Sequence, residues 1–210
     1  MKGTAVLSGT DIDLFISLSE HTAETLKEVY DKLSNSLTTA GYSPKRQNVS
    51  LNITVAGYSV DLVPGKRQNA VSSDHSLYRR KADTWTKTNV FAHARVVIGA
   101  QRKNEIRLLK LWRNQKRLDF PSFYLELSVI RALSARPLPT LLSSNALPTL
   151  SQRVMAVFDY LRDSFSNARI IDPANTNNII SDDLTTAEKT KISAAAKAAR
   201  EASYWEDIVR

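Results

Sequence analysis

Residues 9–18 read GTDIDLFISL, and this stretch decides how the rest of the chain is interpreted. Residues 11–18 of this stretch predict a short β-strand, in which successive side chains point to opposite faces of a sheet. Asp11 and Asp13 are two residues apart, so their carboxylates leave the same face, whereas the apolar Ile12 is expected to point into the core. Two like charges this close repel each other unless a cation lies between them. The pair therefore indicates a divalent-cation site, although a D-x-D sequence is also common at turns and exposed strand ends.

A third carboxylate lies in the next predicted strands. Residues 48–63 alternate polar and apolar side chains and predict a hairpin joined through Ala56-Gly57-Tyr58 and closed by Pro64-Gly65. Asp61 lies between apolar neighbours in the second strand, where a charge is costly unless it is paired or coordinated. Asp11, Asp13 and Asp61 on neighbouring strands would form a site for two Mg²⁺ or Mn²⁺ ions, one activating a hydroxyl and one neutralising a triphosphate.

The remaining pattern predicts a mixed α+β fold. Apolar residues at three- and four-residue spacings predict a helix over 22–40, ended by Gly41. Residues 66–89 are polar and basic and predict loops with room for a short hairpin. The chain is then mostly helical, with helices expected at 90–101, 104–116, 121–135, 150–165 and 186–204. A lobe with a β-hairpin and a helix is thus followed by a helical lobe.

Composition narrows the class of protein. The chain has no cysteine, which excludes disulfides, zinc–thiolate sites and thiol nucleophiles and suits a reducing cytoplasm. No run approaches the roughly 18 uninterrupted apolar residues of a membrane-spanning helix, so a cytoplasmic protein is expected. The 29 basic against 21 acidic residues favour a polyanionic partner, such as nucleotides or nucleic acid. The basic residues gather in 102–117, which is also compatible with an ordinary solvated helix face.

Three segments together resemble the signature of the DNA polymerase β-type nucleotidyltransferases. They are Lys2-Gly3-Thr4, residues 9–14 (GTDIDL) and residues 60–64 (VDLVP). That superfamily includes CCA-adding enzymes, poly(A) polymerases and oligoadenylate synthetases. Later segments are similar to the bacterial CD-NTases, the relatives of cyclic GMP-AMP synthase: 74–78 (DHSLY), 85–89 (WTKTN), 105–112 (EIRLLKLW), 120–127 (FPSFYLEL), and 172–175 (DPAN) with Asn177 and Asn178.

The resemblance implies a fold and a division of the chain. It implies a polymerase β-like palm, with a mixed or antiparallel sheet and helices, over 1–95. A helical lobe like that of the oligoadenylate synthetases is implied over 96–210, packed with the palm as one bilobed unit. Trp85 and Trp112 are expected to be core or interface aromatics, and Glu126 a structurally paired acid.

The resemblance also implies roles for individual residues. Asp11, Asp13 and Asp61 inherit metal binding and catalysis. Lys110 inherits a grip on the triphosphate, although a lysine among leucines can also extend to solvent from a helix edge. Ser122 inherits a phosphate contact, or it simply caps the helix after Pro121. The resemblance adds nucleotide-binding roles for Thr10, His75, Tyr78 and Asn175; His75 and Tyr78 could equally be loop residues without a role.

One feature departs from the family pattern. The family carries a Gly-Ser a few residues before the segment that matches Lys2-Gly3-Thr4, and this chain starts at Met1. A late start codon, a trimmed chain and a degenerate homologue all account for the difference. We expect the chain as given to be weakly active or inactive, because the Gly-Ser holds the incoming triphosphate.

Three functions remain open at this point. The first is synthesis of a cyclic or linear oligonucleotide messenger from nucleoside triphosphates in antiphage defence, with a regulatory or effector protein as a further partner and nucleic acid not required. The second is addition of nucleotides to an RNA end, with the basic 102–117 segment along the RNA. The third is a non-catalytic module that binds nucleotide or RNA. No membrane partner is expected.

Overall fold

The computed structural model describes residues 2–6, 12–134 and 148–210 and confirms the α+β fold class. The chain divides into two compact units. One is Thr10–His93, here called the sheet unit, and the other combines Met1–Gly9 with Ala94–Arg210, here called the helical unit. None of the helices in the described ranges has the length and apolar character needed to cross a membrane.

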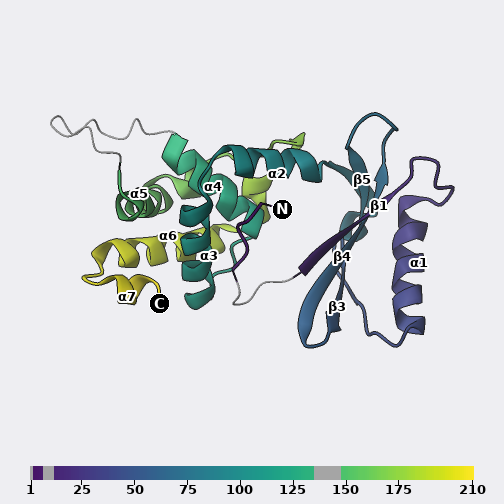
Figure 1. The fold of residues 1–210 in the computed structure, drawn as a ribbon, viewed down its shortest axis with the longest axis horizontal. Coiled ribbons are helices and arrows are strands. Elements are labelled where there is room, and N and C mark those ends of the chain that lie inside the picture. The colour runs from purple at the N-terminus through teal and green to yellow at the C-terminus, as the bar shows by residue number, and fades with distance from the viewer. Residues whose placement is uncertain (1, 7–11, 135–147) are drawn as a thin grey trace. The chain divides into compact units, whose positions relative to one another are not determined.

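The sheet unit is built around one long strand, β4 (Tyr58–Arg67), to which three other strands pair. Leu62 of β4 pairs with Leu14 on one side and Leu51 on the other, and Lys66 pairs with Leu18 and Ser76. One edge of β4 therefore carries the parallel strand β1, while the other edge carries first β3 and then β5, both antiparallel (Figure 1). The remaining strands and their bounds are β1 (Ile12–Leu18), β2 (Lys45–Arg46), β3 (Leu51–Val55), β5 (His75–Arg79) and β6 (Thr84–Thr88).

The predicted hairpin is β3–β4, and its turn explains its register. Ala56 and Gly57 both have positive φ, at 49° and 83°, as a two-residue type I′ turn requires. The expectation that Pro64-Gly65 closes this hairpin is wrong, because β4 continues to Arg67. On this edge of β4, the pairing with β3 ends at Leu62 and the pairing with β5 starts at Gly65. Pro64, which has no N–H to donate, is tolerated because it lies in the gap between the two.

Gly65 fixes how β1 lies against β4. A Cβ atom at this position would lie 2.6 Å from Cζ of Phe15 and 3.0 Å from Cδ2 of Leu77. The Phe15 ring therefore occupies the space above the glycine, and the position opposite Ser17 in β1 accepts no larger residue without movement.

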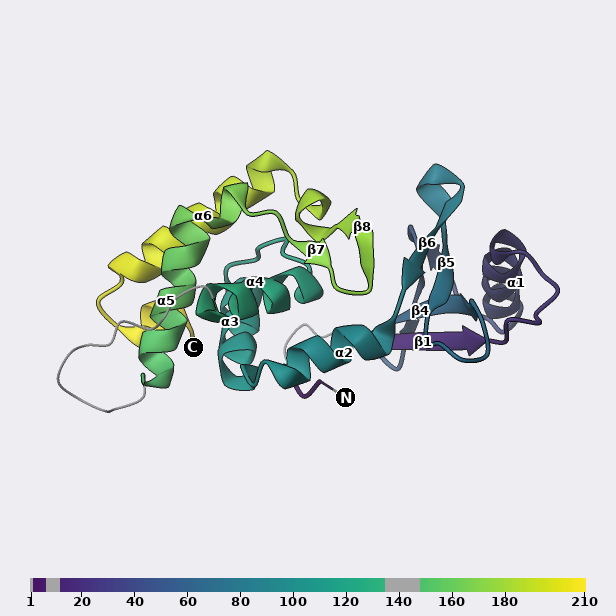
Figure 2. The ribbon, with the colours of Figure 1, turned by 90° about the horizontal axis from the view of Figure 1, so that it is seen from above.

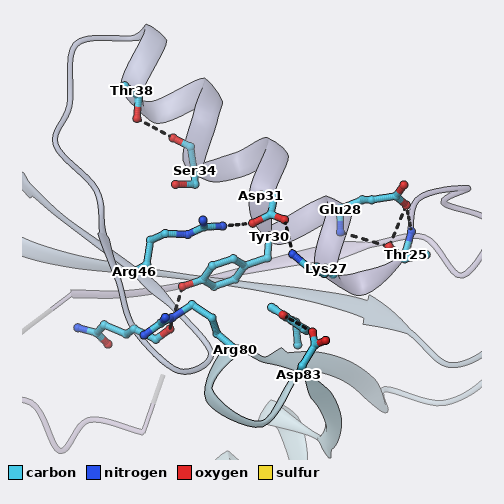
Figure 3. A network of polar contacts seen from close by, with 12 residues as sticks. Thr25, Lys27, Glu28, Tyr30, Asp31, Ser34, Thr38, Arg46, Arg80 and Asp83 are labelled. Atoms are coloured by element: carbon cyan, nitrogen blue, oxygen red, sulfur yellow. Dashed lines mark hydrogen bonds and ion pairs between the residues drawn. The ribbon is translucent and has the colours of Figure 1, made fainter.

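Helix α1 (Leu26–Thr39) covers one face of this sheet (Figure 1). It starts later than predicted because Thr25 and Glu28 form a capping box. Tyr30 is fully buried and packs with Leu51 and Tyr78. Its hydroxyl donates to the backbone carbonyls of Gln47 and Ser50, at 2.9 and 3.0 Å. Figure 3 shows this ring beneath the helix.

Ile12 does not point into a core as expected. Ile12 and Leu14 share the face that α1 covers, yet they are 43% and 49% exposed. The reason is that α1 packs over β4 and β5, and its Tyr30 packs on Leu51 of β3, whereas β1 lies at the opposite edge of β4. The alternating pattern of β1 predicts which side chains share a face of the sheet, but it does not predict that β1 lies at the edge of the sheet.

The helical unit contains one large apolar core, into which Trp112 is completely buried. Helices α5 and α6 pack side by side in it (Figure 2). Trp85, by contrast, is 56% exposed in the sheet unit. The helices predicted after residue 89 all form, with ends that differ by up to three residues. They are α2 (Val90–Gly99), α3 (Lys103–Gln115), α4 (Ser122–Ser134), α5 (Leu150–Asp163) and α6 (Thr186–Glu201). The structure adds a short helix α7 (Trp205–Ile208), strands β7 (Ile171–Asp172) and β8 (Asn175–Ile179), and the 3₁₀ turns η1 (Arg80–Ala82), η2 (Phe165–Asn167) and η3 (Ile180–Asp183).

We predict that Tyr30→Phe lowers the free energy of unfolding by about 1 kcal/mol. The loss is modest because each of the two carbonyls keeps another donor. The Gln47 carbonyl still accepts from the Arg80 guanidinium, and the Ser50 carbonyl still accepts from the backbone N–H of Gln47. Urea unfolding followed by circular dichroism measures it. Tyr58→Phe is the matched control, since Tyr58 is 64% exposed, and equal losses in the two variants would contradict the prediction.

Candidate active site

Asp13 and Asp61 are brought side by side by the pairing of β1 with β4. Their Cα atoms are direct partners in the parallel ladder, so both side chains leave the same face of neighbouring strands, which run about 4.8 Å apart. Asp13 is exposed and Asp61 half-buried. Two carboxylates at this spacing supply the hard oxygen ligands that Mg²⁺ and Mn²⁺ prefer. The donor set of this pair therefore fits a divalent cation.

The third acid of the expected set, Asp11, lies outside the described residues, as does Thr10. Within the ranges that the structure covers, no three His, Cys, Asp or Glu side chains gather into a metal-binding group. The described part of the site is thus the pair formed by Asp13 and Asp61.

Two amide side chains hold Asp61. The Asn52 amide donates to Oδ1 of Asp61 at 2.7 Å, from the position directly opposite in β3. The Gln47 amide reaches the same oxygen at 3.4 Å. Sequence reasoning missed both residues, although the Ala56-Gly57 turn already determines that Asn52 faces Asp61.

His75 lies in the interior of the sheet unit rather than in an open pocket. It is only 5% exposed, and its ring stands edge-on to Phe15. Its Nδ1 lies 2.9 Å from the carbonyl oxygen of Ser73 and must donate to it, since a carbonyl only accepts. Nε2 lies 2.8 Å from the hydroxyl of Ser17 in β1. Both ring nitrogens are therefore engaged, and the ring links β5 to the strand that carries Asp13.

Lys110 and Glu126 form a buried ion pair within the helical unit. Nζ of Lys110 in α3 lies 2.7 Å from Oε1 of Glu126 in α4, and the two residues are 7% and 2% exposed. The Thr4 hydroxyl donates to the same oxygen at 2.6 Å, and the Lys2 ammonium reaches Oε2 at 3.0 Å. Glu126 is thus paired, as expected, and it joins both helices to the segment around Lys2 and Thr4. Sequence reasoning did not foresee the part played by Thr4.

This carboxylate is ionised because its partners outweigh its burial. Burial alone would raise the pKa of Glu126, but the hydrogen bond from Lys110, the charge of Lys2 and the hydrogen bond from Thr4 hold the pKa below its ordinary value of 4.5. Lys110 therefore already has a counter-charge without any bound anion.

The remaining predicted residues lie in three different places. Ser122 is the first residue of α4, and its hydroxyl accepts from the Arg113 guanidinium at 2.9 Å. Asn175 begins β8, and its side-chain oxygen accepts from the backbone amide of Asn177. Tyr78 is buried under α1 and its hydroxyl donates to Asp83 at 2.6 Å. Tyr78 thus belongs to the core of the sheet unit.

We predict that Glu126→Gln lowers the free energy of unfolding at pH 7 by about 3–5 kcal/mol, because it leaves the buried Lys110 charge without its partner. Urea unfolding measures the change. Glu201→Gln removes an acid that is two-thirds exposed and pairs with Lys197 at 3.9 Å, and it should cost almost nothing. A change below about 1 kcal/mol in Glu126→Gln would show that the pair contributes little.

The same pair predicts a pH dependence. Because the pKa of Glu126 is below 4.5 in the folded chain, its contribution is present above pH 4.5 and is lost as the pH falls below that value toward the folded pKa. The stability difference between wild type and Glu126→Gln should therefore stay constant from pH 7 down to about pH 4.5 and narrow as the pH falls further. Denaturant unfolding at several pH values measures it, and parallel curves would contradict the assignment.

Comparisons with known proteins place this fold. No protein-family model matches the sequence, and no curated protein matches it. Among solved structures, CdnC of E. coli MS115-1 with ATP has a TM-score of 0.73 at 22% identity, over 99% of this chain and 79% of that one. The same protein in a complex with HORMA-deltaN gives 0.70 at 20% identity, over 99% and 78%.

Two further structures extend the likeness. The CD-NTase CdnG of Bradyrhizobium diazoefficiens, in complex with GTP, has a TM-score of 0.69 at 14% identity, over 99% of this chain and 79% of that one. The Cid1 poly(U) polymerase has a TM-score of 0.60 at 13% identity, over 95% and 78%. The resemblance seen in the sequence is thus confirmed at the level of the fold: the chain folds as the solved CdnC and CdnG structures do.

Proposed function

We propose that the chain is the core of a metal-dependent nucleotidyltransferase that joins nucleoside triphosphates into a cyclic or linear oligonucleotide messenger. The observation that carries the proposal is the direct pairing of Asp13 with Asp61 on neighbouring strands. Two carboxylates at matched positions of a nucleotidyltransferase fold are the ligands that a triphosphate-bound cation needs.

Asp11, Asp13 and Asp61 would hold two Mg²⁺ or Mn²⁺ ions, which when bound supply activation of the attacking hydroxyl and neutralisation of the triphosphate. The protein's own part is positioning and charge, so no covalent enzyme intermediate is expected. Asp61 helps the attacking 2′- or 3′-hydroxyl lose its proton. Thr10 contributes a nucleotide contact next to the first acid.

Phosphate binding falls to the helical unit in this proposal. The Lys110 ammonium has three N–H groups, and among the described residues one reaches Glu126 and another Thr4; we assign the third to a phosphate oxygen. Ser122 lies at the N-terminus of α4, where backbone amides favour anions, and Asn175 contributes an amide. His75 acts through the position of β1, since both its nitrogens are engaged.

The nucleotide substrates and the biological role extend the proposal. The CdnC and CdnG structures contain ATP and GTP, which supports nucleoside triphosphates as substrates. CdnC was also solved with HORMA-deltaN, which supports a regulatory protein as a partner. A role in antiphage defence in the cytoplasm rests on the sequence resemblance to CD-NTases.

A second candidate is nucleotide addition to an RNA end, which the likeness to the Cid1 poly(U) polymerase favours. Basic side chains of α3, among them Lys103, Arg107 and Arg113, would then follow the RNA phosphates, with a strong dependence on salt.

The activity is tested with radiolabelled nucleoside triphosphates and Mg²⁺. We expect turnover that EDTA abolishes and that Asp13→Asn and Asp61→Asn reduce to background, because each removes a cation ligand. The chain as given is compared with a version preceded by a Gly-Ser segment, which is expected to be the more active. Asp119→Asn is the control, since Asp119 is an exposed acid outside the site.

The products separate the candidates. Small products resistant to alkaline phosphatase, made from triphosphates alone, indicate the messenger synthase. Label incorporated only into added RNA indicates the second candidate. Nucleotide binding without turnover in both versions, unchanged in Asp61→Asn, would overturn the enzymatic proposal and leave a binding module. Equal activity with and without the Gly-Ser segment would contradict the expected effect of that segment.

A further inference from the structure

Asn52 contacts the candidate catalytic acid from the neighbouring strand. It stands directly opposite Asp61 in the β3–β4 ladder, and its Nδ2 donates to Oδ1 of Asp61 at 2.7 Å. An ionised carboxylate accepts hydrogen bonds and donates none, so the group that faces it must be the NH₂ end of the Asn52 amide. The contact is therefore a charge-assisted hydrogen bond, which is stronger than one between neutral groups.

The Asn52 amide is itself held in place. The same Nδ2 donates to the Ser59 hydroxyl at 2.8 Å, so its two hydrogens go to two acceptors, both of them on β4. Asn and Asp side chains otherwise rotate broadly about their terminal torsion. With both hydrogens used, the amide plane is fixed, and so is the oxygen of Asp61 that it meets.

A second amide reaches Asp61 from the loop before β3. Oε1 of Gln47 accepts from the Ser50 hydroxyl at 2.6 Å, which turns Nε2 toward Oδ1 of Asp61 at 3.4 Å. The backbone carbonyl of Gln47 accepts from the Tyr30 hydroxyl and from the Arg80 guanidinium. Figure 3 shows Tyr30 and Arg80 converging there, below α1. A continuous set of hydrogen bonds thus runs from α1 to the carboxylate.

Both amides bond the same oxygen, and neither bonds Oδ2 of Asp61. One oxygen of the acid is therefore committed to the protein, while the rotation of the carboxylate about its terminal torsion is fixed. Asp13 lies at the paired position on β1, on the other side of β4 from Asn52. A ligand carboxylate held this way needs no ordering when a cation arrives, and such outer partners typically change metal affinity 10- to 100-fold.

We infer that Asn52 is a positioning residue of the cation site: with support from Gln47, it commits Oδ1 of Asp61 to the protein and reserves Oδ2 for the cation. The inference rests on the proposed function, because it assigns a cation to the pair formed by Asp13 and Asp61. It extends the site to residues that do not themselves contact the cation or the substrate.

The test measures Mn²⁺ binding to the chain itself by electron paramagnetic resonance, without any need for turnover. Asn52→Leu, which keeps the size of the side chain and removes its donors, should weaken Mn²⁺ binding roughly 10-fold. Ser59→Ala, which frees the amide to rotate, should weaken it less. The matched control is Thr54→Ala, an exposed residue on the same strand, with binding expected as in wild type. Circular dichroism checks that each variant is folded.

The outcomes separate this inference from the proposed function. Asp13→Asn and Asp61→Asn test the cation site itself, and binding equal to wild type in both would overturn the site and the inference together. If both acids matter but a folded Asn52→Leu binds Mn²⁺ as wild type does, the positioning role is wrong and the site stands. Should Asn52→Leu not fold, Ser59→Ala decides: reduced affinity supports the role, and unchanged affinity overturns it.

Discussion

The parallel pairing of β1 with β4 is the constraint on which the candidate site depends. It sets Asp13 beside Asp61 on one face, where two negative charges repel each other. The pairing of the two strands is held by a ladder that continues to Leu18 and by apolar packing of Phe15 and Leu77 around Gly65. The sheet thus holds two carboxylates at directly paired positions of neighbouring strands.

The acids Glu126 and Asp61, one in each compact unit, have different hydrogen-bonding partners. In the helical unit, Glu126 is buried and compensated by Lys110, Lys2 and Thr4, so its charge stabilises the fold. In the sheet unit, the hydrogen bonds that Asp61 accepts from described residues come from the neutral amides of Asn52 and Gln47, which orient the acid without cancelling its charge. An acid that is oriented but not neutralised remains able to bind a cation.

The sequence predicted what depends on local pattern. The α+β class, the β3–β4 hairpin and the helices followed from periodicity. The position of Asn52 opposite Asp61, although it was missed, can also be found from the sequence, by counting the same number of residues from the Ala56-Gly57 turn along each strand. Contacts between distant segments could not be predicted this way. No spacing reveals that Thr4 meets Glu126, 122 residues later, or that β1 lies at a sheet edge where Ile12 stays exposed. The continuation of β4 through Pro64 depended on the gap between two other strands.

Gly65 limits which substitutions the sheet can accept. Any side chain there would force movement of the Phe15 ring, which belongs to the strand that bears Asp13, and of the Leu77 side chain. A methyl group at Gly65, four residues along β4 from Asp61, would therefore disturb the packing between β1 and β4 while leaving both carboxylates chemically intact. The packing between the two strands thus restricts the residue at position 65 although it lies away from both carboxylates along the strand.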